Sequence, residues 1–487
     1  MSRRKPPPPR RPGPPHRPGP PPPGGTHPLG PDLALAERDR TGLRRPFWIV
    51  DGQAYDFSEW MDRHPGGGAW FAESIGRDIT ALFHTYHRDP QRLRAILAKY
   101  RIDDVGAGHV IPNLGLPPFL LPPGFDAVTD VPRFEFGGAG DLRAEIVREV
   151  EKLAPRERLR RYDRVFDAIS VTVLAGHLAV LAALLLGVLP AWACVFLLVL
   201  TRTALAGSGH FYLHRRKPRR PSRVLSPGML PSTLFDFNYV GTYLVGVDGH
   251  VVLHHPYLGS GADIKGAFLG ALRRVHPALR IPAYTVHKLG MALFGIARLG
   301  VPIIFGSTRH AGIRAEFWLV RGFLAAEFVA CAVTGHWLAW LIQFVLTLWF
   351  NTVLITASHD FEPDEQDAPV DGLPERLRGD WAARQIHLSH DLTISGNKWA
   401  DVFLSAGLNT HRVHHTLPFQ RSGFANLVSE PAVRAACEAA GMVWDRPRNL
   451  FTERFPVFVR TYLRGSKGGR HLPARRYVAD GWRTGED

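Results

Sequence analysis

The sequence has very little cysteine, with three residues in a chain of 487. Cys194, Cys331 and Cys437 lie far apart, and two of them fall inside apolar runs. This number and spacing exclude a disulfide framework and a zinc site built from cysteines. The sequence therefore favours a reducing environment and a protein that faces the cytosol.

Acidic residues are scarce relative to basic ones: 44 Asp and Glu against 59 Lys and Arg give a net charge of +15. The basic residues gather in a Pro-rich segment and beside apolar runs, which favours contact with a membrane surface over nucleic acid. The N-terminal region contains no apolar segment of the kind found in secretory signal peptides. We expect a membrane protein with no nucleic-acid partner.

Proline and arginine dominate residues 1–31, which have almost nothing to bury. Such a composition is typical of a disordered or polyproline-II segment. It is interpreted as a solvated tail, with adapter binding through its proline runs as the alternative. A second Pro- and Gly-rich stretch, Val105 to Phe136, is interpreted as a linker. The expected domain bounds are a tail at 1–43, a small domain at 44–105, a linker and juxtamembrane helix at 106–160, a membrane domain at 161–465 and a basic tail at 466–487.

The residues between Arg45 and Asp104 indicate a small soluble domain. "FWIVDGQAYDFSEW" predicts two short strands joined by a turn at Asp51-Gly52 and followed by a helix. Further on, "RHPGG" precedes "GRDITALFHTYHR". Haem iron often takes two axial imidazoles, and a Pro-Gly-Gly turn lets the backbone approach a flat macrocycle.

Three stretches of this domain, "WIVDGQAYDFSEW", "HPGG" and "DITALFHTYH", resemble the cytochrome b5 family. The resemblance implies a b-type haem held by two axial histidines, His64 and His87. His84 is the alternative for the second ligand.

Four apolar stretches are long enough to cross a bilayer, which takes about 20 residues. They are expected as helices at Phe166–Gly187, Pro190–His210, Phe317–Thr334 and Trp337–Ser358. A charged helix ending in "PRERLRRYDR" precedes the first span and "HRRKPRRPSR" follows the second, so both ends are expected on the cytosolic side. The chain would then form two hairpins with both termini on that side, and residues 284–306 would form a helix at the membrane interface.

Histidines cluster at or soon after the expected helix ends. Two of them, His210 and His214, are four residues apart and share one face of a helix. The segments "HVVLHH", "ITASHD" and "THRVHH" supply more histidines further along the chain. The expected topology brings all four segments to the cytosolic side. The candidate metal ligands are His210, His214, His250, His254, His255, His359, His411, His414 and His415.

Nine imidazoles suit two metal ions with four or five ligands each, since a single zinc takes about four. Imidazole binds Fe, Zn, Cu and Ni, so the ligand type alone does not select the metal. A site at the cytosolic mouth of a membrane bundle, with an electron donor attached, indicates iron and O2 chemistry. The isolated His177 and His336 are interpreted as packing or interfacial residues. His387 and His390 either orient ligands or lie on a solvated helix face.

From Phe47 to Phe419 the chain resembles membrane fatty acyl desaturases fused to cytochrome b5, the front-end type in particular. The segments "SHDFE", "DWAARQ" and "NKWADVFLSAGLNTHRVHHTLPF" carry most of the resemblance. The family commonly reads "GGLNxQxxHHLFP" in the last segment. Here Ala406 replaces a Gly, His411 stands at the Gln position and Thr416 precedes Leu-Pro. In the first box, Phe211 stands where the family often has Asp.

The resemblance implies an N-terminal α+β haem domain and an all-α membrane domain of four transmembrane helices in two hairpins, with a cytosolic helical cap. It also implies a di-iron centre held by the nine histidines, with no catalytic residue beyond these ligands. Electrons from an NAD(P)H-dependent reductase would pass through the haem, and O2 would serve to desaturate a fatty acyl lipid or acyl-CoA. The membrane would be a bacterial plasma membrane or the endoplasmic reticulum.

Two other functions stay open from the sequence. A fatty acyl hydroxylase on the same scaffold would use the same ligands and stop after one hydrogen abstraction. A membrane-anchored haem electron carrier would keep the haem but lack the two further irons.

Overall fold

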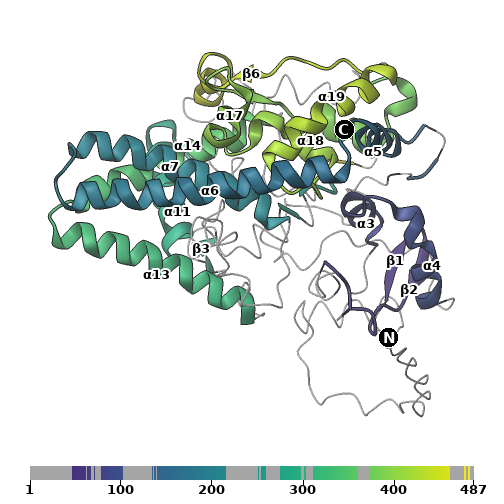
Figure 1. Cartoon of the computed structure of the whole chain (residues 1–487), viewed down its shortest axis with the longest axis horizontal. Helices are drawn as coiled ribbons and strands as arrows, with labels where there is room; N and C mark the ends of the chain where they lie inside the picture. Colours follow the sequence, from purple (N-terminus) through teal and green to yellow (C-terminus); the bar gives the residue numbers. More distant parts are fainter. Residues whose placement is uncertain are drawn as a thin grey trace, which may run out of the picture.

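The computed structural model describes residues 47–102 (except 62, 67–70 and 72–77), 134–214 (except 135 and 139), 250–258 (except 252–253), 275–302 (except 295 and 298–300), 311–359, 373–460, 477–478 and 481–482. The expected N-terminal tail and most of the expected linker lie outside these residues. Figure 1 shows a small unit with strands β1 and β2 beside a larger, mostly helical body.

The small unit begins with an antiparallel pair of strands, β1 (Trp48–Val50) and β2 (Gln53–Tyr55). Both turn residues have positive φ angles, 50° at Asp51 and 73° at Gly52, as a two-residue hairpin turn requires. The predicted strand–turn–strand is confirmed. The helix predicted directly after it is wrong for residues 58–61, which form turns. The remaining elements are α3 (Thr80–Tyr86), η1 (Pro90–Leu93), α4 (Arg94–Leu97) and η2 (Ala98–Tyr100).

The larger body contains four long apolar helices, which Figure 1 shows extending together to one side. They are α6 (Arg156–Leu185), α7 (Ala191–Leu213), α13 (Ala311–Val333) and α14 (Trp337–Ala357). Helix α6 packs against α7, α7 against α14, and α13 against α14. The turns that end α6 and α13 each contain a glycine with positive φ, Gly187 at 66° and Gly335 at 81°, where a side chain would be strained.

Three helices are long and apolar enough to cross a membrane within the described residues: Arg156–Leu185, Ala191–Tyr212 and Trp337–Ala357. Helix α13 has 23 residues and covers the third expected span, but four spans in two hairpins remain a prediction. The basic run "RERLRRYDR" was expected to end a separate helix, and this is wrong. It forms the first turns of α6, because Pro155 starts the helix and no proline interrupts it before Leu185.

Shorter elements pack over α6, α7 and α14, and one of them, α18, carries three of the nine candidate ligands. Helix α5 packs against α16 and α19 around buried Leu142, Ile146, Trp381 and Val433. The two-residue strands β5 and β6 pair in parallel. The elements of this cap are α5 (Leu142–Leu153), η5 (Glu375–Leu377), α16 (Trp381–His387), β5 (Leu392–Thr393), α17 (Lys398–Leu404), η6 (Leu408–Thr410), α18 (His411–Thr416), α19 (Gly423–Ala439), β6 (Arg448–Asn449), the π-helical turn η7 (Leu450–Arg454) and α20 (Phe455–Phe458).

The stretch expected to form one helix over 284–306 is only partly helical. Helix α11 runs from Pro277 to Phe294, and a small antiparallel pair follows, β3 (Ile296–Ala297) and β4 (Val301–Pro302). A last pair, β7 (Tyr477–Val478) and β8 (Gly481–Trp482), lies in the basic C-terminal segment.

Candidate metal centre

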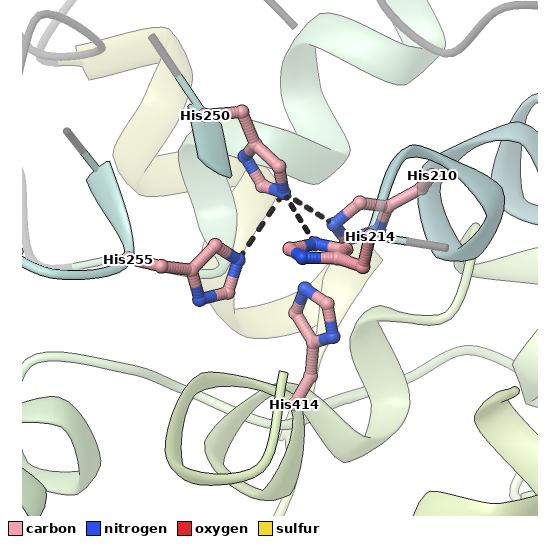
Figure 2. Close-up of side chains that lie close together, drawn as sticks. All are labelled: His210, His214, His250, His255 and His414. Carbon is pink, nitrogen blue, oxygen red and sulfur yellow. Dashed lines mark hydrogen bonds between the residues drawn. The ribbon is translucent and has the colours of Figure 1, made fainter. Parts of the chain in front are cut away.

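Five histidines from three parts of the chain converge in a first cluster (Figure 2). One ring nitrogen of each lies within 4.8 Å of those of the others. The Nε2 atom of His250 is 2.9 Å from that of His210, 3.1 Å from that of His214 and 3.2 Å from that of His255. The cluster consists of His210 and His214 at the end of α7, His250 and His255, and His414 on α18.

The remaining four histidines form a second cluster beside the first. Ligand atoms of His254, His359 and His415 lie within 4.8 Å of one another. The Nε2 atom of His411 is 3.1 Å from that of His415, and its ring centroid is 4.4 Å from that of His359. All nine histidines singled out in the sequence are therefore brought together.

Two pairs of consecutive histidines divide between the clusters. His255 belongs to the first cluster and His254 to the second, while His414 belongs to the first and His415 to the second. Consecutive side chains on a helix do not face each other, but residues four apart do. This explains why His411 and His415 approach each other on α18 while His414 points to the other cluster.

Hydrogen bonds on the outer side of three rings orient the second cluster. The Nδ1 atom of His411 lies 2.9 Å from the carbonyl oxygen of Ser358, and that of His359 lies 3.3 Å from the carbonyl oxygen of Leu388. His415 Nδ1 lies 2.9 Å from Oε1 of Gln385. Carbonyl oxygens only accept hydrogen bonds, so each Nδ1 must carry the proton. Each Nε2 then keeps its lone pair for a metal.

The contacts between ring nitrogens fit a metal better than a set of hydrogen bonds. A ring nitrogen has either one proton or one lone pair, so His250 Nε2 cannot bond to three neighbours at once. His411 and His415 turn two lone pairs toward each other at 3.1 Å. Imidazole nitrogens bind a divalent metal at about 2.0–2.1 Å, so two of them at right angles lie about 3.0 Å apart. The donor set therefore fits metal ions.

The protonation state of the clusters also suits a metal. Burial and the neighbouring imidazoles hold the pKa values of His255 and His415 well below the ordinary value for histidine. Both rings are neutral at pH 7 for this reason, and a neutral imidazole is the form that binds metals.

Two buried arginines fix the segments that carry these ligands. Arg412, which directly follows His411 on α18, donates to the carbonyl oxygens of Ser389 and Asp445, at 3.0 and 2.8 Å. Its backbone N–H donates to Asp391 at 3.0 Å. Arg454 donates to the carbonyl oxygens of Ala357 and His359, at 2.9 and 3.0 Å, and so caps the end of α14.

The candidate haem ligands also face each other. The ring centroids of His64 and His87 are 5.9 Å apart, near the separation of about 6 Å expected for two imidazoles bound at 2.0–2.1 Å to one metal. A Cβ atom on Gly66 would lie 2.7 Å from Cε1 of His64, so only glycine fits there. His87 Nδ1 donates to the carbonyl oxygen of Phe83 at 2.8 Å, and burial lowers the pKa of His87 to about 4. These residues fit a haem.

The alternative ligand His84 has other contacts. Its Nε2 lies 2.8 Å from the carboxylate of Asp51, and its ring stacks on Phe136 with centroids 4.1 Å apart. The geometry therefore favours His87 as the partner of His64.

The other singled-out histidines lie outside both clusters. His177 contacts Thr201 and Glu327 inside the helix bundle, at 2.8 and 3.0 Å. His336 is the N-cap residue of α14. His390 is buried, and its backbone N–H donates to Ser358 at 2.9 Å, while His387 is half-buried at the end of α16.

Sequence reasoning missed the residues that orient the ligands. Gln385 lies within the quoted "DWAARQ", but nothing in that motif assigns its partner His415. The hydroxyl of Tyr86 lies 3.1 Å from Nδ1 of His214, but the sequence shows only that this tyrosine directly precedes His87. Contacts between residues so far apart in the chain give no periodic signal in a single sequence.

Comparisons with known proteins agree with this division of the chain. Residues 34–106 match the family described as "Cytochrome b5-like Heme/Steroid binding domain", and residues 186–447 match "Fatty acid desaturase". No solved structure matches the chain.

Several curated proteins are similar over most of their length. An acyl-lipid omega-13 desaturase of Chlamydomonas reinhardtii is 23% identical over 83% of this chain and 90% of its own. An acyl-lipid (8-3)-desaturase of Mortierella alpina is 25% identical over 76% of this chain and 83% of its own. A cytochrome b5-related protein of Drosophila melanogaster is 23% identical over 76% and 78%, respectively. The chain therefore belongs to the fatty acid desaturase family, as an oxidoreductase of membrane character that carries a cytochrome b5-like haem domain ahead of its desaturase domain.

Proposed function

We propose that this protein desaturates a fatty acyl chain, as an acyl-lipid or acyl-CoA, at a di-iron centre that uses O2 and receives electrons through its own haem. One observation carries the proposal: nine imidazoles from four segments form two adjoining clusters, five in one and four in the other. Two of the curated relatives are named acyl-lipid desaturases, which supports an acyl-lipid substrate.

Two iron ions, once bound to these clusters, would supply the reduction of O2 and the removal of hydrogen from an unactivated acyl CH2 group. The residues of the chain do the rest. The outer hydrogen bonds of His359, His411 and His415 hold their Nε2 atoms toward the centre. Eight of the nine rings are buried, which limits the access of water. His255 and His415 are neutral, so these rings need not lose a proton before they bind iron.

The haem held by His64 and His87 would be the electron donor, and an NAD(P)H-dependent reductase would supply it. Fusion keeps the donor at a high effective concentration near the metal site. The basic segments on either side of the α6–α7 pair support an orientation with both termini and the histidine clusters on the cytosolic side. The domain bounds given above, including a desaturase domain at 161–465, belong to the same proposal.

The proposal is tested by His415→Ala, with the exposed His276→Ala as the control. We expect His415→Ala to lose iron and product while the haem absorbance stays unchanged, and the control to keep all three. Product is measured by mass spectrometry of host lipids and iron by elemental analysis.

Three outcomes would contradict the proposal. Full turnover by His415→Ala would exclude the histidine clusters as the catalytic centre. A product heavier by one oxygen, rather than lighter by two hydrogens, would assign the hydroxylase instead. Wild-type protein with haem iron but without two further irons would assign the electron carrier.

A further inference from the structure

In the described part of the haem domain, the side chain of Tyr86 touches the first histidine cluster. Tyr86 ends α3 and directly precedes the haem ligand His87. Its hydroxyl oxygen lies 3.1 Å from Nδ1 of His214 and 3.1 Å from the carbonyl oxygen of Val251. The rings of Tyr86 and His214 are nearly parallel, at 26°, with centroids 5.9 Å apart.

The direction of these hydrogen bonds follows from the groups involved. The carbonyl of Val251 can only accept, so the phenol donates to it. The phenol oxygen then accepts from Nδ1–H of His214, which leaves Nε2 of that ring with its lone pair. That Nε2 is the atom that faces His250, at 3.1 Å. A residue of one domain thus fixes the tautomer of a candidate metal ligand in the other.

Further contacts hold the same face of the haem domain against α5, the helix that packs against α16 and α19 of the cap. Arg143 on α5 donates to the carbonyl oxygen of His87 at 2.6 Å, and Arg88 forms an ion pair with Glu151 at 3.0 Å. The two residues that follow Tyr86 are therefore both held by α5, and the approach to His214 does not depend on one contact.

We propose that Tyr86 couples the haem to the first histidine cluster, by orienting His214 and by completing the path for the electron. The path runs from His87 through one peptide bond to Tyr86 and across a hydrogen bond to His214. One electron passes at a time: ferrous haem becomes ferric, and one ferric ion at the cluster becomes ferrous. No bond is made or broken, and the phenol keeps its proton. This inference rests on the proposed function, in which an NAD(P)H-dependent reductase would reduce the haem.

The test uses the full-length protein loaded with haem and iron, fully oxidised and free of oxygen. A light flash reduces the haem, and the decay of its ferrous absorbance reports transfer to the cluster. Tyr86→Phe keeps the ring but removes the hydroxyl, and Tyr86→Leu removes both. The matched control is Tyr100→Phe, in the same domain but packed against Phe57 and Trp60.

We expect Tyr86→Phe to slow the decay about tenfold and Tyr86→Leu to slow it on the order of a hundredfold. The haem spectrum and the haem midpoint potential of Tyr86→Phe should match those of the wild type, and the decay rates are compared at equal iron content, measured for each protein. Tyr100→Phe should transfer at the wild-type rate.

Two results would be decisive against parts of this scheme. A wild-type rate in both Tyr86 variants overturns the role of Tyr86 and leaves the proposed function intact. Ferrous haem that persists in wild-type protein as long as in iron-free protein overturns the fused haem as donor, and with it the proposed function.

Discussion

The outer side of each imidazole decides which nitrogen faces the centre. Gln385 is the one side chain among the three acceptors described for the second cluster, since His359 and His411 use backbone carbonyls. A substitution can remove a side-chain acceptor but not a backbone carbonyl. The effect of such an acceptor on ring orientation can therefore be tested by substitution at Gln385.

Gln385→Leu should weaken iron binding at the second cluster by about 10–100-fold, because His415 loses the acceptor that fixes its tautomer. Gln385→Glu keeps an acceptor oxygen and should retain iron. Iron content after dialysis against a chelator measures the difference, with haem absorbance as the internal control. Equal iron retention in the Leu and Glu variants would show that Gln385 does not position His415.

The candidate ligands were predictable residue by residue, and their division between two clusters was not. Spacing of four residues placed His210 with His214 on a shared helix face, while the pairing of His411 with His415 emerged only from the structure. The assignment of His254 and His255 to different clusters depends on their contacts with α7, α14 and α18. Such contacts join segments far apart in the chain and have no local pattern.

Helix α7 packs against the cap at Gly207, where its backbone lies very close to the backbone of Ala406. A Cβ atom on Gly207 would lie 2.5 Å from Cα and 2.8 Å from the carbonyl carbon of Ala406. Ala406 itself has a φ of 54°, so this turn has little freedom to retreat. The two shortest distances are to backbone atoms, so a rotation of a side chain cannot relieve them.

Gly207→Ala should destabilise the protein by about 1–3 kcal/mol, since overpacking forces the backbone to shift. Gly176→Ala on α6 is the matched control, because nothing lies within 4 Å of its added Cβ. That change should be neutral or stabilising by about 0.5–1 kcal/mol. Thermal unfolding in detergent compares the two variants, and a Gly207→Ala protein as stable as Gly176→Ala would refute the close contact.

The bounds of the long helices were largely predictable, and the exceptions have local causes. The observed α7 and α14 begin within a residue of the predicted start. Helix α6 begins ten residues earlier than the predicted span. The prediction followed the apolar segment, and the helix also includes the charged residues before it. A charged turn can continue a helix beyond the lipid when no proline or glycine stops it.

A buried polar network joins the four long helices of the whole bundle. The carboxylate of Glu327 on α13 accepts from Arg202 on α7 at 2.5 Å and lies 3.0 Å from Nε2 of His177 on α6. It also accepts from Trp340 on α14 at 3.3 Å. Charged groups inside a membrane protein are costly and are retained when they are paired.

Removing one partner of this network should cost more than removing both. Glu327→Ala leaves Arg202 buried without its carboxylate and should destabilise the bundle by about 3–5 kcal/mol. Glu327→Ala combined with Arg202→Leu should regain much of that loss. The exposed pair of Arg434 and Glu438 on α19 is the control, and Glu438→Ala should change little. Thermal unfolding of the wild type, Glu327→Ala, Arg202→Leu and the double variant measures the coupling, and simple additivity would argue against it.

Two pairs of consecutive histidines, each divided between the clusters, join the two clusters covalently. At His254–His255 and again at His414–His415, one peptide unit supplies a ligand to each compartment, and neighbouring Cα atoms are fixed about 3.8 Å apart. The distance between the two clusters is therefore limited by covalent geometry at these two pairs, in addition to the packing of separate elements. A backbone displacement at either pair therefore moves a ligand in both clusters, whereas a change at Gln385 or Tyr86 acts on one cluster.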